Sequence, residues 1–230
     1  NGCKLNIIDT PGMDDFVGGV ISALSVADTA VMMINSVNGV EVGTEISNRN
    51  AEKFHKPMML LVNHLDHENS NWDNTIDMAK TTFGNKLAIV QYPVNPGQGY
   101  NKAIDLMKMK MLQWKPAGGA PEELDIPVSE NDKAEELHNQ LIEMAAENEE
   151  SLMELFFENG TLSEEDIRKG LKVGMINRGV FPVFCTVAAH DMGVRRVMDF
   201  ISDVAPHPGE VSSPKTAEGK PVKIDANGPT

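Results

Sequence analysis

The chain has 230 residues and a formal net charge of −14, a length that can bury a sizeable core in one large or two small domains. The acidic balance argues against direct binding of a nucleic-acid backbone, because that affinity comes from clustered lysine and arginine. No apolar stretch is long enough to span a bilayer and no signal peptide is recognisable, so the sequence predicts a soluble, cytoplasmic protein that does not associate with membranes.

The first predicted element is a strand over Lys4–Ile8, which leads directly into Asp9-Thr10-Pro11-Gly12. A strand that ends in Asp-x-x-Gly can put a carboxylate beside a nucleotide's Mg²⁺ and a glycine amide beside its terminal phosphate. The same residue types are also common in simple turns. On its own, the tetrapeptide is therefore a weak indication of a phosphate site.

Helices and buried strands alternate after this motif. The two strands are continuous apolar runs, as expected where a sheet is covered on both faces. Their order predicts an α/β fold with a doubly wound, mostly parallel sheet. The predicted helices span 16–27, 44–54 and 72–83, and the predicted strands span 30–34 and 58–62.

Asn63-His64-Leu65-Asp66 follows the strand over 58–62 and places an amide and a carboxylate at the carboxyl end of a parallel strand, where open α/β sheets bind ligands. Two plainer interpretations compete. Asn63 and Asp66 could cap a helix, and His64 and His67 could form a metal site with Asp66 and Glu68, although the flanking ligand pairs of zinc sites are missing. The order of the two motifs within one α/β pattern favours a guanine-nucleotide-binding domain.

An insertion interrupts this alternation from about residue 85 to residue 178. It begins with short apolar runs that predict a small sheet. These runs span 87–92, 103–106 and 109–111.

Acidic helices follow within the insertion, over 131–146 and 149–158. A further helix should open at Thr161, whose hydroxyl stands three residues before Glu164 in a capping box. Between residues 122 and 166, Lys133 is the only lysine or arginine. The acidic helices therefore offer either a solvated face or a docking surface for a basic protein.

The last part of the chain returns to the core pattern. Residues 181–186 predict a buried strand and residues 193–204 a closing helix, followed by a tail rich in Pro, Gly and Ser. Cys3 and Cys185 lie in apolar runs and are predicted to be reduced core residues. The predicted segments are core residues 1–84, an inserted subdomain over 85–178, core residues 179–205 and a linker over 206–230.

Together these segments resemble the G domain of elongation factor G, a translational GTPase. The resemblance extends to about Pro208 and includes the insertion, which corresponds to the G-prime subdomain and is more specific than the nucleotide motifs. The matching segments are 4–12, Asp15-Phe16, 62–66, Ala103-Ile104-Asp105-Leu106, Lys108-Met109-Lys110, Val183 and Cys185.

The resemblance implies roles for individual residues. Asp9 would reach Mg²⁺ through water, the Gly12 amide would sense the γ-phosphate, and Asp66 would accept hydrogen bonds from guanine N1 and N2. Asn63 would tie the base loop to the phosphate loop, and the Ala188 amide would donate to guanine O6. The implied GTP-binding set is Asp9, Thr10, Pro11, Gly12, Met13, Asn63, His64, Leu65, Asp66, Val187 and Ala188.

Three departures from the family pattern fall at the expected nucleotide site. Met13 occupies the place of the histidine that orients the attacking water, and a thioether cannot do this, so no catalytic residue is assigned. His64 replaces a lysine that packs on the purine face, and Val187 replaces a serine. These changes indicate a divergent paralogue with altered nucleotide dependence.

The resemblance implies a ribosome-dependent GTPase that uses GTP and Mg²⁺ and promotes translocation, with the acidic insertion contacting the ribosomal stalk protein. The alternative is a ribosome-protection or specialised elongation factor that binds guanine nucleotide but hydrolyses it weakly or not at all. A Rossmann oxidoreductase is a distant third, because no Gly-x-Gly-x-x-Gly follows a strand. The sequence also holds no Gly-x-x-x-x-Gly-Lys-Ser/Thr and begins without Met, which suggests a fragment whose first strand has lost its neighbours in the sheet.

Overall fold

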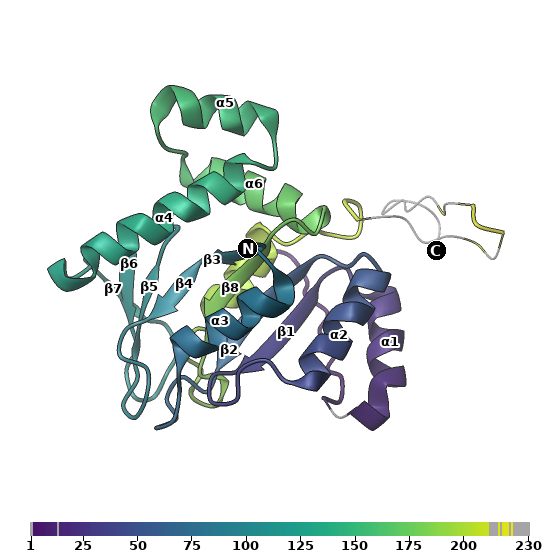
Figure 1. The fold of residues 1–230 in the computed structure, drawn as a ribbon, viewed down its shortest axis with the longest axis horizontal. Coiled ribbons are helices and arrows are strands. Elements are labelled where there is room, and N and C mark those ends of the chain that lie inside the picture. The colour runs from purple at the N-terminus through teal and green to yellow at the C-terminus, as the bar shows by residue number, and fades with distance from the viewer. Residues whose placement is uncertain (1, 13, 212–215, 217, 221, 223–230) are drawn as a thin grey trace.

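The computed structural model describes residues 2–12, 14–211, 216, 218–220 and 222. Within them the chain forms two sheets and the helices that pack on these sheets (Figure 1). Much of the predicted linker over 206–230 lies outside the described residues.

The first sheet is parallel, as the sequence predicts, and its strand order is β1-β2-β8-β3. β2 and β8 lie in its centre and are buried because they are continuous apolar runs. The strands are β1 (Ala30–Asn35), β2 (Met58–Asn63), β3 (Leu87–Ile89) and β8 (Phe181–Cys185), and the accompanying helices are α1 (Val17–Val26), α2 (Val42–Lys53), α3 (Trp72–Phe83) and α7 (Val194–Asp203).

Aromatic contacts show that helices cover both faces of this sheet. Phe181 and Phe184 of β8 point to opposite faces, because side chains alternate along a strand. Phe181 meets Phe83 of α3 with ring centroids 6.1 Å apart, and Phe184 meets Phe200 of α7 with ring centroids 4.7 Å apart. The predicted doubly wound α/β fold is therefore confirmed.

The second sheet is antiparallel, with strand order β4-β5-β6-β7, and helices follow it in the chain. It supplies the small sheet that the apolar runs predict. Its strands are β4 (Gln91–Pro93), β5 (Lys102–Asp105), β6 (Lys110–Gln113) and β7 (Glu122–Leu124), and the helices are α4 (Asn131–Ala146), α5 (Glu150–Asn159) and α6 (Glu164–Ile176). Short 3₁₀ turns span Asp14–Phe16, Val128–Glu130 and Ala188–His190.

The apolar run over 87–92 does not form one strand of the small sheet, contrary to the sequence expectation. Its first part, β3, pairs with β8 in the parallel sheet, and its last part, β4, pairs with β5. Val90 lies between them: its amide donates to the Val183 carbonyl at 3.0 Å, and its carbonyl accepts from the Leu106 amide at 2.9 Å. The chain thus passes from one sheet to the other without a loop.

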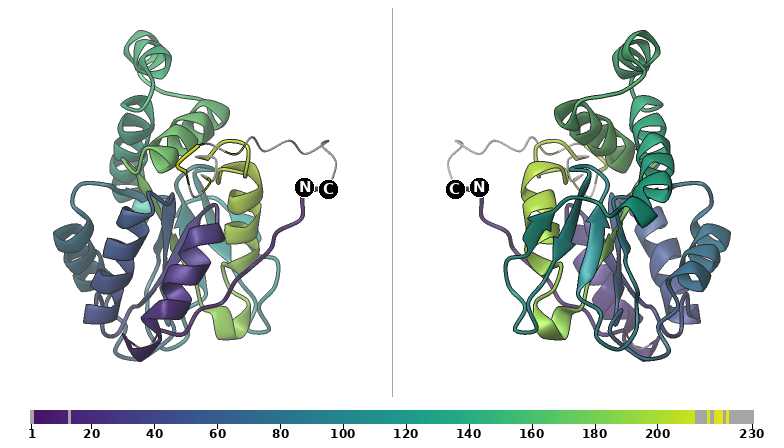
Figure 2. Two further views of the ribbon diagram at one scale, coloured as in Figure 1. Left: turned by 90° about the vertical axis from the view of Figure 1, so that its right-hand side faces the viewer. Right: turned by 90° about the vertical axis from the view of Figure 1, so that its left-hand side faces the viewer.

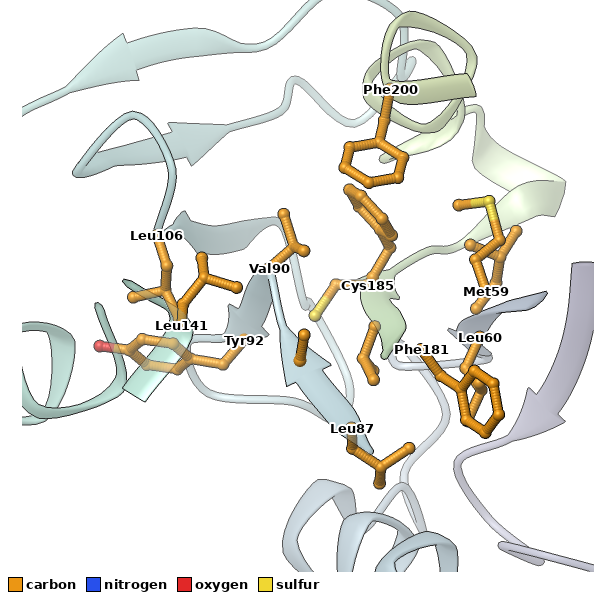
Figure 3. Packing of buried hydrophobic residues seen from close by; sticks show 14 of the residues in the cluster. Met59, Leu60, Leu87, Val90, Tyr92, Leu106, Leu141, Phe181, Cys185 and Phe200 are labelled. Atoms are coloured by element: carbon orange, nitrogen blue, oxygen red, sulfur yellow. The ribbon is translucent and has the colours of Figure 1, made fainter. Parts of the chain in front are cut away.

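The two sheets share one continuous hydrophobic core. Figure 3 shows Val90 between Cys185 of β8 and Leu106 beyond β5, with Tyr92 and Leu141 next to Leu106. The acidic helices take part in this core through their apolar sides, since α4 contacts β3 and α6 contacts β8. Their charged residues lie on the outside, so the insertion has its own sheet but not its own core.

The predicted strand over Lys4–Ile8 is wrong, because residues 2–12 form neither helix nor strand. Ile7 and Ile8 are 77% and 54% exposed, and the segment runs outside the sheet to the start of α1 (Figure 2). A strand needs a neighbour for its backbone hydrogen bonds, and no described strand pairs with this one. Cys3 is consequently exposed rather than in the core, whereas Cys185 is buried as predicted.

The capping box predicted at Thr161 and Glu164 is also wrong in its position. α5 ends at Gly160, whose left-handed backbone (φ +70°) turns the chain, and α6 is capped by Ser163. The Ser163 hydroxyl accepts a hydrogen bond from the Asp166 amide at 3.2 Å. The cap therefore lies two residues later, where the backbone is extended and a hydroxyl again stands three residues before an acid.

No helix in the described part of the chain is both long and apolar enough to cross a membrane.

Candidate functional site

The carboxyl end of β2 is joined to the loop after β8 by the side chain of Asn63. Its Oδ1 accepts from the Ala188 amide at 3.0 Å and from the Thr186 hydroxyl at 3.3 Å. β2 and β8 are adjacent parallel strands, so their carboxyl ends meet at the edge where α/β sheets bind ligands. Two segments far apart in the sequence thus form one polar edge. In this structure the Ala188 amide, expected to donate to guanine O6, donates to Asn63.

The loop after Asn63 is attached to the hydrophobic core by Leu65. The Leu65 side chain is fully buried, so it faces the core rather than a ligand. His64 is exposed and has a left-handed backbone (φ +63°), which is uncommon for a residue with a side chain. The buried Ser36 hydroxyl donates to the His64 carbonyl at 2.9 Å and fixes this conformation. His64 and Asp66 therefore flank the buried Leu65 in the sequence.

Asp66 carries the only carboxylate of the predicted base-recognition motif, and its side chain is 32% exposed. Its Oδ2 lies 3.6 Å from Nε2 of His190, on the loop after β8. A shallow hollow of about 360 Å³ opens beside it, lined by His64, Asp66, His67, Glu68 and Gln98. A partly exposed carboxylate in such a hollow can accept two hydrogen bonds from a ligand.

The alternative of a metal site at this loop finds no support. Among the described residues, no group of three or more His, Cys, Asp or Glu side chains is arranged to hold a metal ion.

Val187 and Ala188 begin the loop after β8, which is closed by its own backbone. The Val187 amide donates to the Met192 carbonyl at 3.0 Å, and the Met192 amide donates back at 3.2 Å. Val187 is buried, so it contributes packing and no hydroxyl to this loop. Ala188 is exposed at the turn, with its amide directed at Asn63.

Asp9, Thr10, Pro11 and Gly12 lie apart from this cluster. They belong to the irregular segment before α1, and Asp9, Pro11 and Gly12 are exposed. Among the described residues, no hydrogen bond joins them to residues 63–66. Met13 lies outside the described residues. The structure therefore brings together the predicted base-contacting residues, but not the predicted phosphate-contacting ones.

Mg²⁺ usually takes one or two protein carboxylates and completes its shell with water and substrate phosphates. Asp9 is an exposed carboxylate and fits the water-mediated role implied for it. The phosphate ligands of such an ion would have to be held by other groups.

A buried ion pair ties the antiparallel sheet to α7, and no sequence motif indicated it. Nε of Arg196 donates to Oδ2 of the fully buried Asp105 at 2.6 Å, and Gln91 donates to the same oxygen at 3.2 Å. The other oxygen accepts from the amides of Met107 and Lys108, both at 3.1 Å. Burial alone would lower the pKa of Arg196, but the charge and hydrogen bond of Asp105 reverse this and raise it.

Sequence reasoning also missed His190 and Gln98, which flank Asp66 from two different loops. Neither belongs to a motif. The sequence feature that comes closest to indicating these two residues is the presence of glycines. Gly97 and Gly99 flank Gln98 in the sequence, and Gly118 and Gly119 lie against His190 and Asp191 in the structure.

Comparison with known proteins gives two findings. The family model described as "Elongation factor Tu GTP binding domain" matches residues 1–207. A crystal structure of a protein from Thermus thermophilus is similar with a TM-score of 0.80 and 25% sequence identity. The similarity covers 88% of this chain and 30% of the Thermus protein, so the chain spans under a third of that protein's length.

Proposed function

The chain belongs to the family of the elongation factor Tu GTP-binding domain, the G domains of translational GTPases, and from this premise we propose that it recognises guanine as part of an elongation factor G-like protein acting in ribosomal translocation. The observation that carries the proposal is the meeting of Asn63, Asp66 and Ala188 at the carboxyl edge of the parallel sheet. The acidic insertion supports the elongation factor G type, and its place of action would be the cytoplasm. Residues 1–84 and 179–205 would form the nucleotide-binding core and residues 85–178 the inserted subdomain, except that β3 belongs to the core sheet.

Each group has a role that its chemistry allows. Asp66 would accept the N1–H and N2–H of guanine, and the Ala188 amide would transfer its hydrogen bond from Asn63 to guanine O6. The exposed imidazole of His64 would lie on the purine face. Leu65 and Val187 would support the two loops from the core.

The phosphate side of the site would use Asp9 for Mg²⁺ through water and the Gly12 amide for the γ-phosphate. When bound, Mg²⁺ would neutralise charge on the phosphates. No Gly-x-x-x-x-Gly-Lys-Ser/Thr occurs in the 230 residues, so the main phosphate contacts of such proteins are not supplied by this sequence.

The second candidate is a factor that binds guanine nucleotide but hydrolyses it weakly or not at all, such as a specialised elongation or ribosome-protection factor. Met13 favours it, because a thioether neither orients a water by hydrogen bonding nor carries charge.

Asp66→Asn tests the base site directly, in a protein that joins this chain to a phosphate-binding loop. Guanine offers two donors to a carboxylate, whereas xanthine has an oxygen in place of the 2-amino group, which suits the asparagine amide. We expect affinity for GDP to fall about tenfold to a hundredfold and affinity for xanthosine diphosphate to rise. Competition with a fluorescent nucleotide measures both. An unchanged preference for GDP would reject the assignment of Asp66.

The chain by itself should bind GTP weakly or not at all. The base contacts of Asp66 and Ala188 must overcome the lost freedom of the ligand without the usual phosphate-cradling amides. Isothermal titration calorimetry with Mg²⁺ and GTP should give no binding in the micromolar range, which corresponds to about −8 kcal/mol. Micromolar binding would mean that other residues hold the phosphates.

The acidic helices should act as the contact for a basic protein of the ribosome, which we propose to be the stalk protein. α5 projects from the body of the molecule (Figure 1), and its charged residues Glu150, Glu154 and Glu158 are exposed. Reversing these three charges to lysine should slow association with ribosomes at low salt by about tenfold, since such charges act mainly by steering.

The matched control for this variant reverses Glu45, Asp73 and Asp77, which are exposed on the core helices α2 and α3. The two variants have the same net charge but differ in where the change lies. Equal association rates, measured by stopped flow, would rule out a specific role of α5.

A further inference from the structure

We infer that the inserted antiparallel sheet is part of the base-recognition site, and that Gly118 is a positioning residue for guanine. The inference rests on the proposed function. It is carried by two contacts between the insertion and the loops that hold Asp66 and Ala188, and by a third contact to α7, which begins where the second loop ends.

The first contact fixes the loop after β2. The Gly97 amide, in the β4–β5 turn, donates to the Leu65 carbonyl at 2.7 Å. Leu65 stands between His64 and Asp66, so this bond sets the direction in which both neighbours point. Gln98, the next residue of the turn, lines the same hollow as Asp66. The insertion therefore contributes one wall of the hollow.

The second contact fixes the loop after β8. The Gly119 amide donates to the Asp191 carbonyl at 3.2 Å. Gly118 lies against the same loop, and a Cβ added to it would meet the His190 carbonyl oxygen at 1.8 Å. Only glycine permits this approach, both for lack of space and because its φ is +74°. The loop after β6 is thus packed directly on the backbone that carries His190.

The third contact is the buried pair between Asp105 of β5 and Arg196 of α7. α7 begins directly after the loop over 187–193, so the pair holds the far end of that loop to the antiparallel sheet. Recognition of a base requires its contacts to be held within about 0.5 Å. The three contacts add a restraint from the insertion to the restraint that Ser36 and Asn63 provide from the parallel sheet.

One consequence is reciprocal coupling. A partner that shifts the inserted sheet would move Gly97 and Gly118 together with both base loops, and nucleotide binding would change the partner's affinity by the same factor.

The test compares Gly118→Ala with Gly84→Ala in the chain as it is. Gly84, at the end of α3, has nearly the same φ (+72°), but a Cβ there would meet nothing within 4 Å. Both variants place an alanine at a positive φ, and only Gly118→Ala also displaces the His190 carbonyl. Gly119→Ala is a second control inside the same loop, with φ +88° and open space around a Cβ.

The first readout is amide hydrogen exchange by NMR, expressed as the exchange rate of Ala188 relative to the core amides of β2. A general loss of stability speeds exchange of the β2 amides and therefore lowers this ratio, so a rise in the ratio reports local opening of the loop. We expect the ratio to rise about tenfold in Gly118→Ala and not to rise in either control. Equal ratios in Gly118→Ala and Gly84→Ala would overturn the inference. If Gly118→Ala does not fold, Asp105→Asn, which keeps the shape of the side chain, is judged by the same ratio.

The second readout is titration with GMP, and with AMP as the wrong base, at concentrations on the order of 10 mM. GMP should shift the amide signals of Asp66 and Ala188, and Gly118→Ala should weaken this response about threefold relative to Gly84→Ala. An equal response of the wild-type chain to GMP and to AMP would refute the proposed function itself, because the two loops would then not distinguish guanine from adenine. A normal GMP response in Gly118→Ala would refute the inference and leave the proposed function intact.

Discussion

Arg196→Met should lower the free energy of unfolding by about 3–5 kcal/mol. The substitution keeps most of the apolar stem of the side chain but leaves the Asp105 carboxylate without its cation. Asp105 is fully buried and Arg196 is 8% exposed, so solvent cannot replace the lost partner. A loss of this size is a large part of the about 5–15 kcal/mol that stabilises a typical domain.

Urea denaturation followed by circular dichroism measures the effect. The matched control is Lys110→Met, because Lys110 forms an ion pair with Asp125 at 2.7 Å that lies on the surface of the same sheet. The midpoint of unfolding of that variant should lie at the same urea concentration as that of the wild-type protein, since exposed ion pairs contribute little to stability. Arg196→Met combined with Asp105→Leu should regain part of the loss, because both charges are then removed together. A midpoint for Arg196→Met equal to that of Lys110→Met would contradict the assigned role of the buried pair.

Met13→His should raise ribosome-stimulated GTP hydrolysis by about a hundredfold in a protein that joins this chain to a phosphate-binding loop. An imidazole can orient the attacking water and stabilise developing charge, whereas a thioether can do neither. Asp14, the next residue, limits the gain, because an extra carboxylate near the phosphates opposes the developing negative charge.

Single-turnover hydrolysis with and without ribosomes is the appropriate measurement, with nucleotide affinity determined separately. Met13→Gln serves as a control that restores hydrogen bonding without the imidazole. If Met13→His binds GTP normally and hydrolyses it no faster, the deficit lies elsewhere or does not exist. A wild-type protein as fast as its histidine-bearing relatives would refute the interpretation of Met13.

The sequence predicted the elements whose signals are local. α3 matches its predicted span of Trp72–Phe83 because Asn71 accepts from the Asn74 amide at its start and Gly84 ends it with a positive φ. α4 likewise spans Asn131–Ala146, the range predicted for it, although no side chain caps its N-terminus.

The failures concern interactions between distant residues. Lys4–Ile8 has the composition of a strand, but pairing depends on a neighbouring strand that composition does not reveal. The run over 87–92 is uniformly apolar, so nothing in it marks Val90 as the point where the chain changes sheets. The proximity of Asp66 to His190 and Gln98 could not be predicted either, because these three residues lie in three loops that are far apart in the sequence.

The passage of the chain through Val90 has a consequence for how such a protein can change during evolution. Insertions are often treated as modules that can be gained or lost at a surface loop, because neither part then depends on the other. Here β3 completes the edge of the parallel sheet beside β8, and the residues that follow it build the second sheet on the same core. Excision of residues 85–178 would remove a core strand and uncover β8. The inserted segment is therefore inherited together with the domain around it, and its sequence is constrained by the packing of both sheets.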